Sequence, residues 1–221
     1  MSKLLPILRK RLQEAGDPER AAGQQAYMKS SMPFHGVTSG QMRAIGKEVF
    51  DARRIGSAEE WRGEALSMWR GAQFREERYA AIALTGHRDY AEFQTLDVLP
   101  MYEEMIVTGA WWDFVDSVAP HRVGEILLRR YPAKVKRIMR AWSRDDDMWK
   151  RRSSIICQLT FKRETDLDLL YACIEPSLPS SEFFLRKAIG WALRQYAWTD
   201  PDEIRRYVAA NRQRLSPLSV R

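Results

Sequence analysis

Four segments of this chain share one pattern, and that pattern constrains the fold more than any other feature. They begin at residues 71, 108, 145 and 180 and read GAQFREERYAAIAL, TGAWWDFVDSVAP, DDDMWKRRSSIICQL and SSEFFLRKAIGWAL. Each starts with small or helix-capping residues, reaches an aromatic side chain, and continues with apolar residues at helical spacing. The aromatic anchors Phe74, Trp112, Trp149 and Phe184 are separated by 38, 37 and 35 residues. The chain therefore carries an internal repeat.

A period slightly under 40 residues is close to that of HEAT-type helical pairs, which run about 40–47 residues. Strand-like alternation and Asn-Gly hairpin signals are scarce in the rest of the sequence. One helical pair cannot bury its apolar side alone, so neighbouring pairs must stack. We therefore expect an all-α fold, an α-solenoid of HEAT-like repeats that forms a concave basic groove, with residues 1–221 as a single domain.

Local signals set the expected helices. Asp17 is placed as a helix cap with Pro18 in the first turn, and the acids Asp145–Asp147 should cap the helix that follows them. Residues 32–40 are expected to form a loop. Helices are expected over residues 2–15, 17–30, 41–54, 58–70, 72–85, 89–107, 110–118, 120–130, 132–142, 146–160, 165–175, 180–197 and 200–212.

Composition narrows the class of protein. The 221 residues are 45% hydrophobic and carry a net charge of +7, which points to a globular chain with a polyanionic partner. No apolar run reaches the roughly 18 residues of a membrane span, and the N-terminus does not read as a signal peptide. Cys157 and Cys173 lack a CxxC context, and the three histidines lie far apart in sequence. We expect reduced thiols, no metal, no cofactor and a cytoplasmic protein.

The positive charge is concentrated in one segment. Residues 129–163 contain 12 Lys or Arg and three acids, a net charge of +9 that exceeds the charge of the whole chain. A run of basic residues can form a binding surface for a polyanion, or it can be an ordinary solvated helix face. The run by itself leaves both interpretations open.

The repeat register brings four side chains onto one stripe. With each anchor aromatic as position 0, Trp112 is at 0, Asp116 at +4, Arg152 at +3 in the next repeat and Trp191 at +7 in the last. Positions 0, +3, +4 and +7 share one face of a helix, so stacked repeats would align these residues along a groove. The alternative is that this stripe is the buried face of each repeat.

The motifs WWDFVD, WKRRS and FFLRKAIGWALRQYA resemble the DNA alkylation repair family of HEAT-like repeat glycosylases, the AlkD-like enzymes. YMKSSMPFHGV at 27–37 is similar to their N-terminal helix and loop, and PLSVR to the lead-in to their last helix, so the resemblance covers essentially the whole chain. Gly109 and Ala110 depart from the family, in which a basic residue often precedes the two tryptophans.

The resemblance implies excision of alkylated purines, typically 7-methylguanine and 3-methyladenine, from double-stranded DNA by a monomer that associates with the nucleoid. It implies that Asp116, Trp112 and Arg152 are catalytic. Asp116 would stabilise the sugar cation and guide water, and Arg152 would grip a phosphate. Without a suitable lysine beside the aspartate, hydrolysis without a lyase step is expected. The implied substrate and DNA contacts are Trp191, Tyr27, Lys150, Arg151 and Lys187.

Two other function classes stay open: a non-catalytic DNA-binding scaffold and a HEAT-like adaptor for an acidic protein. Some aromatic residues are expected to be structural. Trp111 should face away from Trp112 into the core, and Tyr27 could also be a core residue. The tryptophans expected to pack between helices are Trp61, Trp69, Trp142 and Trp198.

Overall fold

The protein is described here as a computed structural model that covers residues 2–220. Every regular element within those residues is a helix, so the expected all-α class is confirmed. The chain divides into two compact units, the first ending at Gln94 and the second beginning at Thr95. The single domain and the concave basic groove therefore stay predictions.

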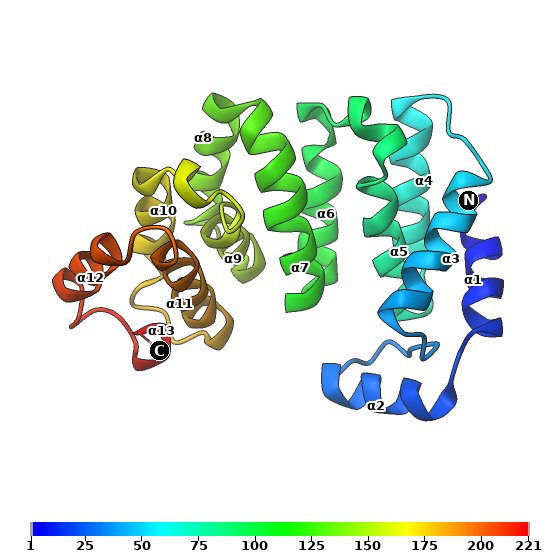
Figure 1. Cartoon of the computed structure of the whole chain (residues 1–221), viewed down its shortest axis with the longest axis horizontal. Coiled ribbons are helices and arrows are strands. Elements are labelled where there is room, and N and C mark those ends of the chain that lie inside the picture. The colour runs from blue at the N-terminus through cyan, green and yellow to red at the C-terminus, as the bar shows by residue number, and fades with distance from the viewer. Residues whose placement is uncertain (1, 221) are drawn as a thin grey trace. The chain divides into compact units, whose positions relative to one another are not determined.

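Within residues 2–94, the first unit is built of the α-helices α1 to α5 (Figure 1) and a 3-10 helix. The expected cap at Asp17 is confirmed, since its carboxylate accepts the Arg20 N–H, and Thr38 and Gln41 form a reciprocal capping box. The elements are α1 (Leu5–Glu14), α2 (Pro18–Met28), α3 (Ser39–Asp51), α4 (Ala58–Gly71), α5 (Arg75–Thr85) and η1 (Arg88–Phe93).

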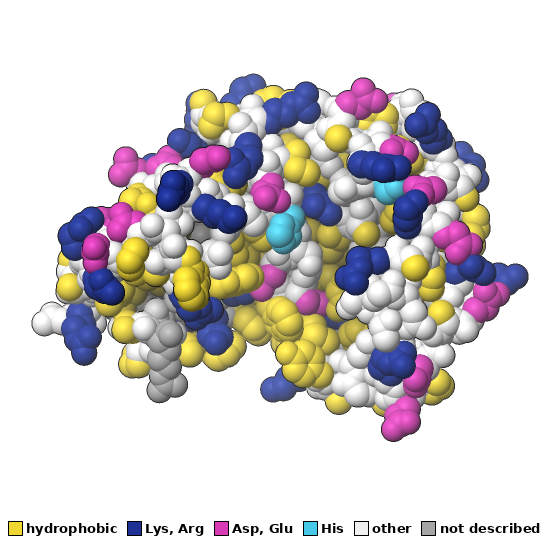
Figure 2. All heavy atoms as spheres, in the orientation of Figure 1, with side chains coloured by type: hydrophobic (Ala, Val, Ile, Leu, Met, Phe, Trp, Pro, Cys, Tyr) yellow, Lys and Arg dark blue, Asp and Glu magenta, His cyan; other side chains and the backbone are white. Residues whose placement is uncertain are grey.

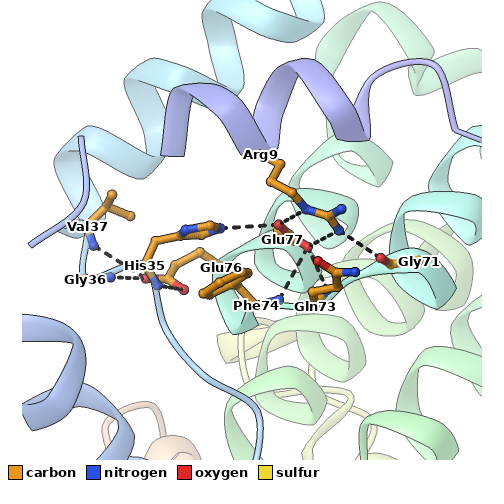
Figure 3. A network of polar contacts seen from close by, with 9 residues as sticks. All are labelled: Arg9, His35, Gly36, Val37, Gly71, Gln73, Phe74, Glu76 and Glu77. Atoms are coloured by element: carbon orange, nitrogen blue, oxygen red, sulfur yellow. Dashed lines mark hydrogen bonds and ion pairs between the residues drawn. The ribbon is translucent and has the colours of Figure 1, made fainter. Parts of the chain in front are cut away.

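Two consecutive glutamates at the start of α5 hold the loop between α2 and α3 (Figure 3). The Glu76 carboxylate accepts the backbone N–H groups of His35 and Gly36 at 3.0 and 2.9 Å. Gly36 has a φ of +84°, and a Cβ there would lie 2.0 Å from the Asp17 carbonyl oxygen. The loop can follow this path only with glycine at position 36.

Glu77 is fully buried and binds a second set of donors (Figure 3). It accepts from Arg9 Nε at 2.7 Å, from the Gln73 N–H at 2.7 Å, and contacts His35 Nε2 at 3.2 Å. Burial alone would raise the pKa of Glu77, but these hydrogen bonds outweigh it and lower the pKa to about 2. The network ties α1, the loop and α5 together.

The second unit continues as stacked helices joined by short turns. The caps of α9, α10 and α12 are Asp147, Asp166 and Asp200, so the expected capping by the Asp145–Asp147 run is confirmed. The elements are η2 (Leu96–Val98), α6 (Leu99–Gly109), α7 (Trp112–Val118), η3 (Ala119–Leu128), α8 (Pro132–Trp142), α9 (Met148–Ile156), η4 (Lys162–Glu164), α10 (Leu167–Ile174), η5 (Glu175–Ser177), α11 (Phe183–Ala197), α12 (Pro201–Ala210) and α13 (Pro217–Val220).

One expected helix was wrong. The single helix expected over 89–107 is broken into η1, η2 and α6, with Thr95 extended between them. Pro100 has no N–H to donate and lies in the first turn of α6, where none is needed, so it marks a helix start. The elements expected over 110–118 and 120–130 are found as α7 and η3. They follow each other without a loop, and the π-helical turns of η3 accommodate Pro120.

Helix η3 packs closely on the end of α9. A Cβ built at Gly124 would lie 1.8 Å from the Cys157 carbonyl oxygen, so any larger residue at 124 would force the two helices apart. Since α7 and η3 run on without a break, this contact also fixes how α7 lies against α9.

Three of the four tryptophans expected between helices are buried: Trp61, Trp69 and Trp142. The expectation for Trp198 was wrong, because 84% of this residue is exposed at the end of α11. Its position after the last apolar turn of α11 carries it beyond the packed helices. Among residues 2–220 no helix is both long and apolar enough to cross a bilayer.

Candidate functional site

The first half of the site is built by the start of α7. Ala110 adopts a left-handed conformation and Trp111 an extended one, which turns the chain sharply before the helix begins at Trp112. Trp112 and Asp116 then lie one turn apart, as their spacing predicted. Both residues are partly exposed, while Phe114 and Val115 between them are buried. Helix α7 therefore presents an indole and a carboxylate on its accessible side.

The second half comes from α9, where Arg152 faces Asp116. Arg152 Nε donates to Asp116 Oδ1 and Nη2 donates to Oδ2, both at 2.8 Å, which is the paired geometry of a bidentate ion pair. The Asp147 side chain caps α9 by accepting the N–H groups of Trp149 and Lys150, so the helix start is fixed one turn before Arg152. The repeat register predicted that Asp116 and Arg152 line one groove, and in the structure they are in direct contact.

A third helix completes the arrangement. Arg152 Nη1 donates to the backbone carbonyl of Phe184, in the first turn of α11, at 2.6 Å. One guanidinium thus links α7, α9 and α11, of which α9 packs against both others (Figure 1). This backbone acceptor was missed by reasoning from side-chain types, because a carbonyl leaves no signal in a sequence.

The ion pair has a buried side and an accessible side. The Arg152 side chain is 5% exposed, whereas that of Asp116 is 15% exposed. Burial raises the pKa of Asp116, and so does the charge of Asp113, while the hydrogen bonds and charge of Arg152 oppose the rise. The Arg152 guanidinium favours the charged form of Asp116, since it binds both carboxylate oxygens. The remaining lone pairs of the Asp116 carboxylate can serve a ligand.

An aromatic cluster supports this pair from the side. Trp111, Trp149 and Phe184 contact one another with ring centroids 5.1–6.3 Å apart, in tilted and edge-on arrangements. The core role expected for Trp111 fits this cluster. The anchor of the second repeat was misassigned by one residue, since Trp111 rather than Trp112 packs on the anchors of the next two repeats. That shift leaves Trp112 outside the cluster.

Trp191 lies seven residues after Phe184 on α11, about 10 Å along the helix axis at 1.5 Å per residue. It is partly exposed, as Trp112 is. Within the predicted stripe, Asp116 and Arg152 are in direct contact. The roles of Trp112 and Trp191 at this site stay predictions. Arg152 is committed to Asp116 and Phe184, so its predicted grip on a phosphate also stays a prediction.

The three basic residues near the site that were predicted to contact DNA differ in their exposure and in their partners. Lys150 is paired with Glu103 at 2.9 Å and with Asp145 at 2.5 Å, which argues against the DNA contact predicted for it. Burial lowers the pKa of Lys150, but these two acids outweigh it and raise the pKa. Arg151 donates to Ser177 Oγ at 3.2 Å. Lys187 is exposed and forms no ion pair within residues 2–220.

Residues 129–163 carry a net charge of +9, but several of their Lys and Arg side chains are neutralised by ion pairs in the structure. Arg129, Lys136, Lys150 and Arg152 form ion pairs with Glu164, Asp166, Glu103 and Asp116, all acids outside the segment. Lys and Arg side chains over the second unit are dispersed among other side chains on the face shown in Figure 2. Counting charges along the chain overstated the free positive charge, because helices from neighbouring repeats supply the acids.

Two further expectations concern the first unit and metals. Tyr27 is 77% exposed on α2, which rules out the core alternative and leaves the predicted DNA contact untested. Over the part of the chain that the structure describes, no group of three or more His, Cys, Asp or Glu side chains is arranged to hold a metal ion.

Comparison with known proteins identifies a family and similar solved structures. The family model of the DNA alkylation repair enzymes matches residues 8–221. A solved structure described as a predicted DNA alkylation repair enzyme from Enterococcus faecalis superposes with a TM-score of 0.83 and 28% sequence identity, covering 92% of each chain. A comparison with proteins of curated function finds no match.

Proposed function

Since this chain belongs to the DNA alkylation repair enzyme family, we propose that it is a monofunctional DNA glycosylase. Its substrates are cationic alkylated purines, 7-methylguanine and 3-methyladenine, in duplex DNA. The observation that carries the proposal is the Asp116 carboxylate, bound on both oxygens by the buried Arg152 and accessible on its other side.

A cationic purine is a good leaving group, so its release needs little or no general acid catalysis. The C1′–N bond breaks, its electron pair goes to the base, and the positive charge of the base is neutralised. The sugar is left as an oxocarbenium-like cation, which a fixed carboxylate stabilises electrostatically. Water then adds to C1′ and loses a proton. Asp116 is suited to both steps, because Arg152 holds it in one orientation and burial makes it a better base than an exposed aspartate.

The partly exposed indoles supply recognition of positive charge. Trp112 shares a face of α7 with Asp116, and Trp191 lies further along α11. A cation over an indole face gains up to about 2 kcal/mol when it is desolvated. Two such rings and a carboxylate favour a charged base over a neutral one.

Contacts to the DNA backbone come from side chains that are not already paired. Lys187 is exposed, and Arg151 has donors beyond its hydrogen bond to Ser177. We include Tyr27 as a contact from the first unit. Hydrolysis without a lyase step is proposed because Asp116 is paired with an arginine, and the nearby Lys150 is bound by Glu103 and Asp145.

The test is release of free base from methylated duplex DNA, followed by chromatography and mass spectrometry. We expect 7-methylguanine and 3-methyladenine to be released with intact abasic strands, and uracil and hypoxanthine to be retained in control duplexes. Salt-dependent binding of duplex DNA without base release would instead identify the chain as a non-catalytic scaffold. Strand cleavage at the abasic site would contradict the monofunctional mechanism.

A further inference from the structure

The exposed Trp198 borders a cavity that the proposed active site does not use. This open cavity of about 570 Å³ lies in the second unit, between the end of η3, the segment after α9 and the end of α11. We call it the Trp198 cavity. Its lining residues include Arg129, Phe161, Lys162, Arg163, Glu164 and Trp198.

Position separates this cavity from Asp116. Trp198 follows Phe184 by 14 residues on α11. At 1.5 Å per residue the two lie about 20 Å apart along the helix axis. Phe184 holds Arg152 at the start of α11, so a ligand in the Trp198 cavity would sit roughly 20 Å from the ion pair. The cavity therefore needs an explanation of its own.

Trp198 offers a flat apolar surface to solvent. Its exposed fraction of 84% is the largest among the exposed large hydrophobic residues of the described chain. An indole in water leaves its apolar surface unburied, so a planar ligand that stacks on the ring gains by covering that surface.

The surroundings of Trp198 are basic. Arg129, Lys162 and Arg163 line the cavity with a single acid, Glu164, so the lining carries an excess of two positive charges. The Arg129 guanidinium is fixed between Glu164 and the Phe161 ring, 4.2 Å from the ring centroid. Lys162 and Arg163 are exposed and form no ion pair within residues 2–220. These two cations are available to an anionic ligand.

An exposed aromatic ring beside free cations is the combination that binds unpaired nucleotides. A base stacks on the ring whatever its sequence, and the phosphates on either side pair with Lys and Arg. Bases inside a duplex are stacked on each other and cannot reach an indole. An acidic protein segment would use the cations and leave the indole face bare.

We propose that the Trp198 cavity is a second nucleic-acid site that binds an unpaired nucleotide of single-stranded DNA. The base stacks on Trp198, and the flanking phosphates contact Lys162 and Arg163. This site is independent of base excision at Asp116, because the cavity lies at the end of α11 and the Asp116–Arg152 ion pair contacts its start.

The test is binding of a fluorescent thymidine oligomer to the full chain, measured by anisotropy at low salt. Base stacking contributes about 1–3 kcal/mol per base, so Trp198→Ala should weaken binding about 5- to 150-fold. Trp198→Phe keeps a ring and should stay close to the unsubstituted protein. Arg163→Ala should weaken binding more than Arg212→Ala, which removes an exposed cation outside the cavity.

Controls make the result decisive. Trp198 is exposed, so Trp198→Ala should leave the melting temperature and the rate of base release from duplex DNA unchanged. An abasic oligomer with the same number of phosphates should bind the unsubstituted protein more weakly than the thymidine oligomer. Equal binding of the abasic oligomer, unchanged affinity of Trp198→Ala, or an equal dependence on Trp198 for an acidic peptide would each overturn the proposal.

Discussion

Arg152 and Asp116 are 36 residues apart in sequence and meet through two parallel hydrogen bonds of 2.8 Å. The third contact of the guanidinium, to the Phe184 carbonyl, makes the carboxylate orientation depend on three helices at once. Such a contact can stabilise the fold, orient a catalytic group, or do both. The first two predictions separate these roles.

Asp116→Asn should abolish most base release and leave duplex binding nearly unchanged. The amide keeps the shape of the carboxylate and removes its charge, and loss of an aimed electrostatic stabiliser costs about 3 kcal/mol of barrier, or roughly 100-fold in rate. Single-turnover release of 7-methylguanine is the measurement. Asp113→Asn is the matched control in the same helix and should stay within a few-fold of the unsubstituted rate. Release at full rate by Asp116→Asn would remove this residue from the mechanism.

Arg152→Ala should destabilise the protein and should also slow base release. Removing one partner of a buried ion pair leaves the other charge uncompensated, at a cost of about 3–5 kcal/mol in the free energy of unfolding. Chemical denaturation measures this. The double variant Asp116→Leu with Arg152→Met replaces both charges by apolar groups and should recover most of that stability while remaining inactive. If the double variant recovers activity too, the ion pair is structural only.

Replacing Trp112 or Trp191 by Leu should slow release of 7-methylguanine about 30-fold, since a desolvated cation–π contact is worth up to about 2 kcal/mol. Neither variant should unfold, because both indoles are partly exposed. Trp111→Leu is the contrasting variant. It removes a ring from the cluster with Trp149 and Phe184 and should lower the melting temperature. Loss of stability in the Trp112 and Trp191 variants would identify them as core residues.

Lys187 and Lys150 should respond oppositely to substitution by alanine. Lys187→Ala should weaken duplex binding and reduce the log–log salt slope by about 0.9, the value for one phosphate contact. Lys150→Ala should change DNA affinity little and should destabilise the protein, because it leaves Glu103 and Asp145 without their cation. Titrations at several salt concentrations, paired with thermal melts, distinguish the two. Equal salt slopes for both variants would show that the ion pairs of Lys150 open on DNA.

Acid should weaken the first unit through Glu77. Its pKa is about 2 in the folded protein against an ordinary 4.5, so the carboxylate contributes stability above pH 4.5 that is lost as the pH falls toward 2. The contribution is on the order of 3 kcal/mol, because each pKa unit corresponds to about 1.36 kcal/mol. Unfolding free energies measured across this window should fall more steeply for the unsubstituted protein than for Glu77→Gln. Parallel curves would show that other carboxylates govern the acid transition.

Sequence periodicity determined the all-helical class, the repeat and most helix positions, because these depend on local spacing, caps and prolines. Asp147 caps α9 as its sequence position required. The repeat also predicted that Asp116 and Arg152 line one groove, and the structure brings the two side chains into direct contact.

Tertiary structure decided what local spacing could not. The Phe184 carbonyl, the acids that neutralise Lys150, and the exposure of Trp198 all depend on which segments meet across repeats. The same is true of the one-residue shift that puts Trp111 in the aromatic cluster and leaves Trp112 outside it. A residue's own neighbours in sequence set its helix and its face, but its charge partners and its burial are set by side chains tens of residues away.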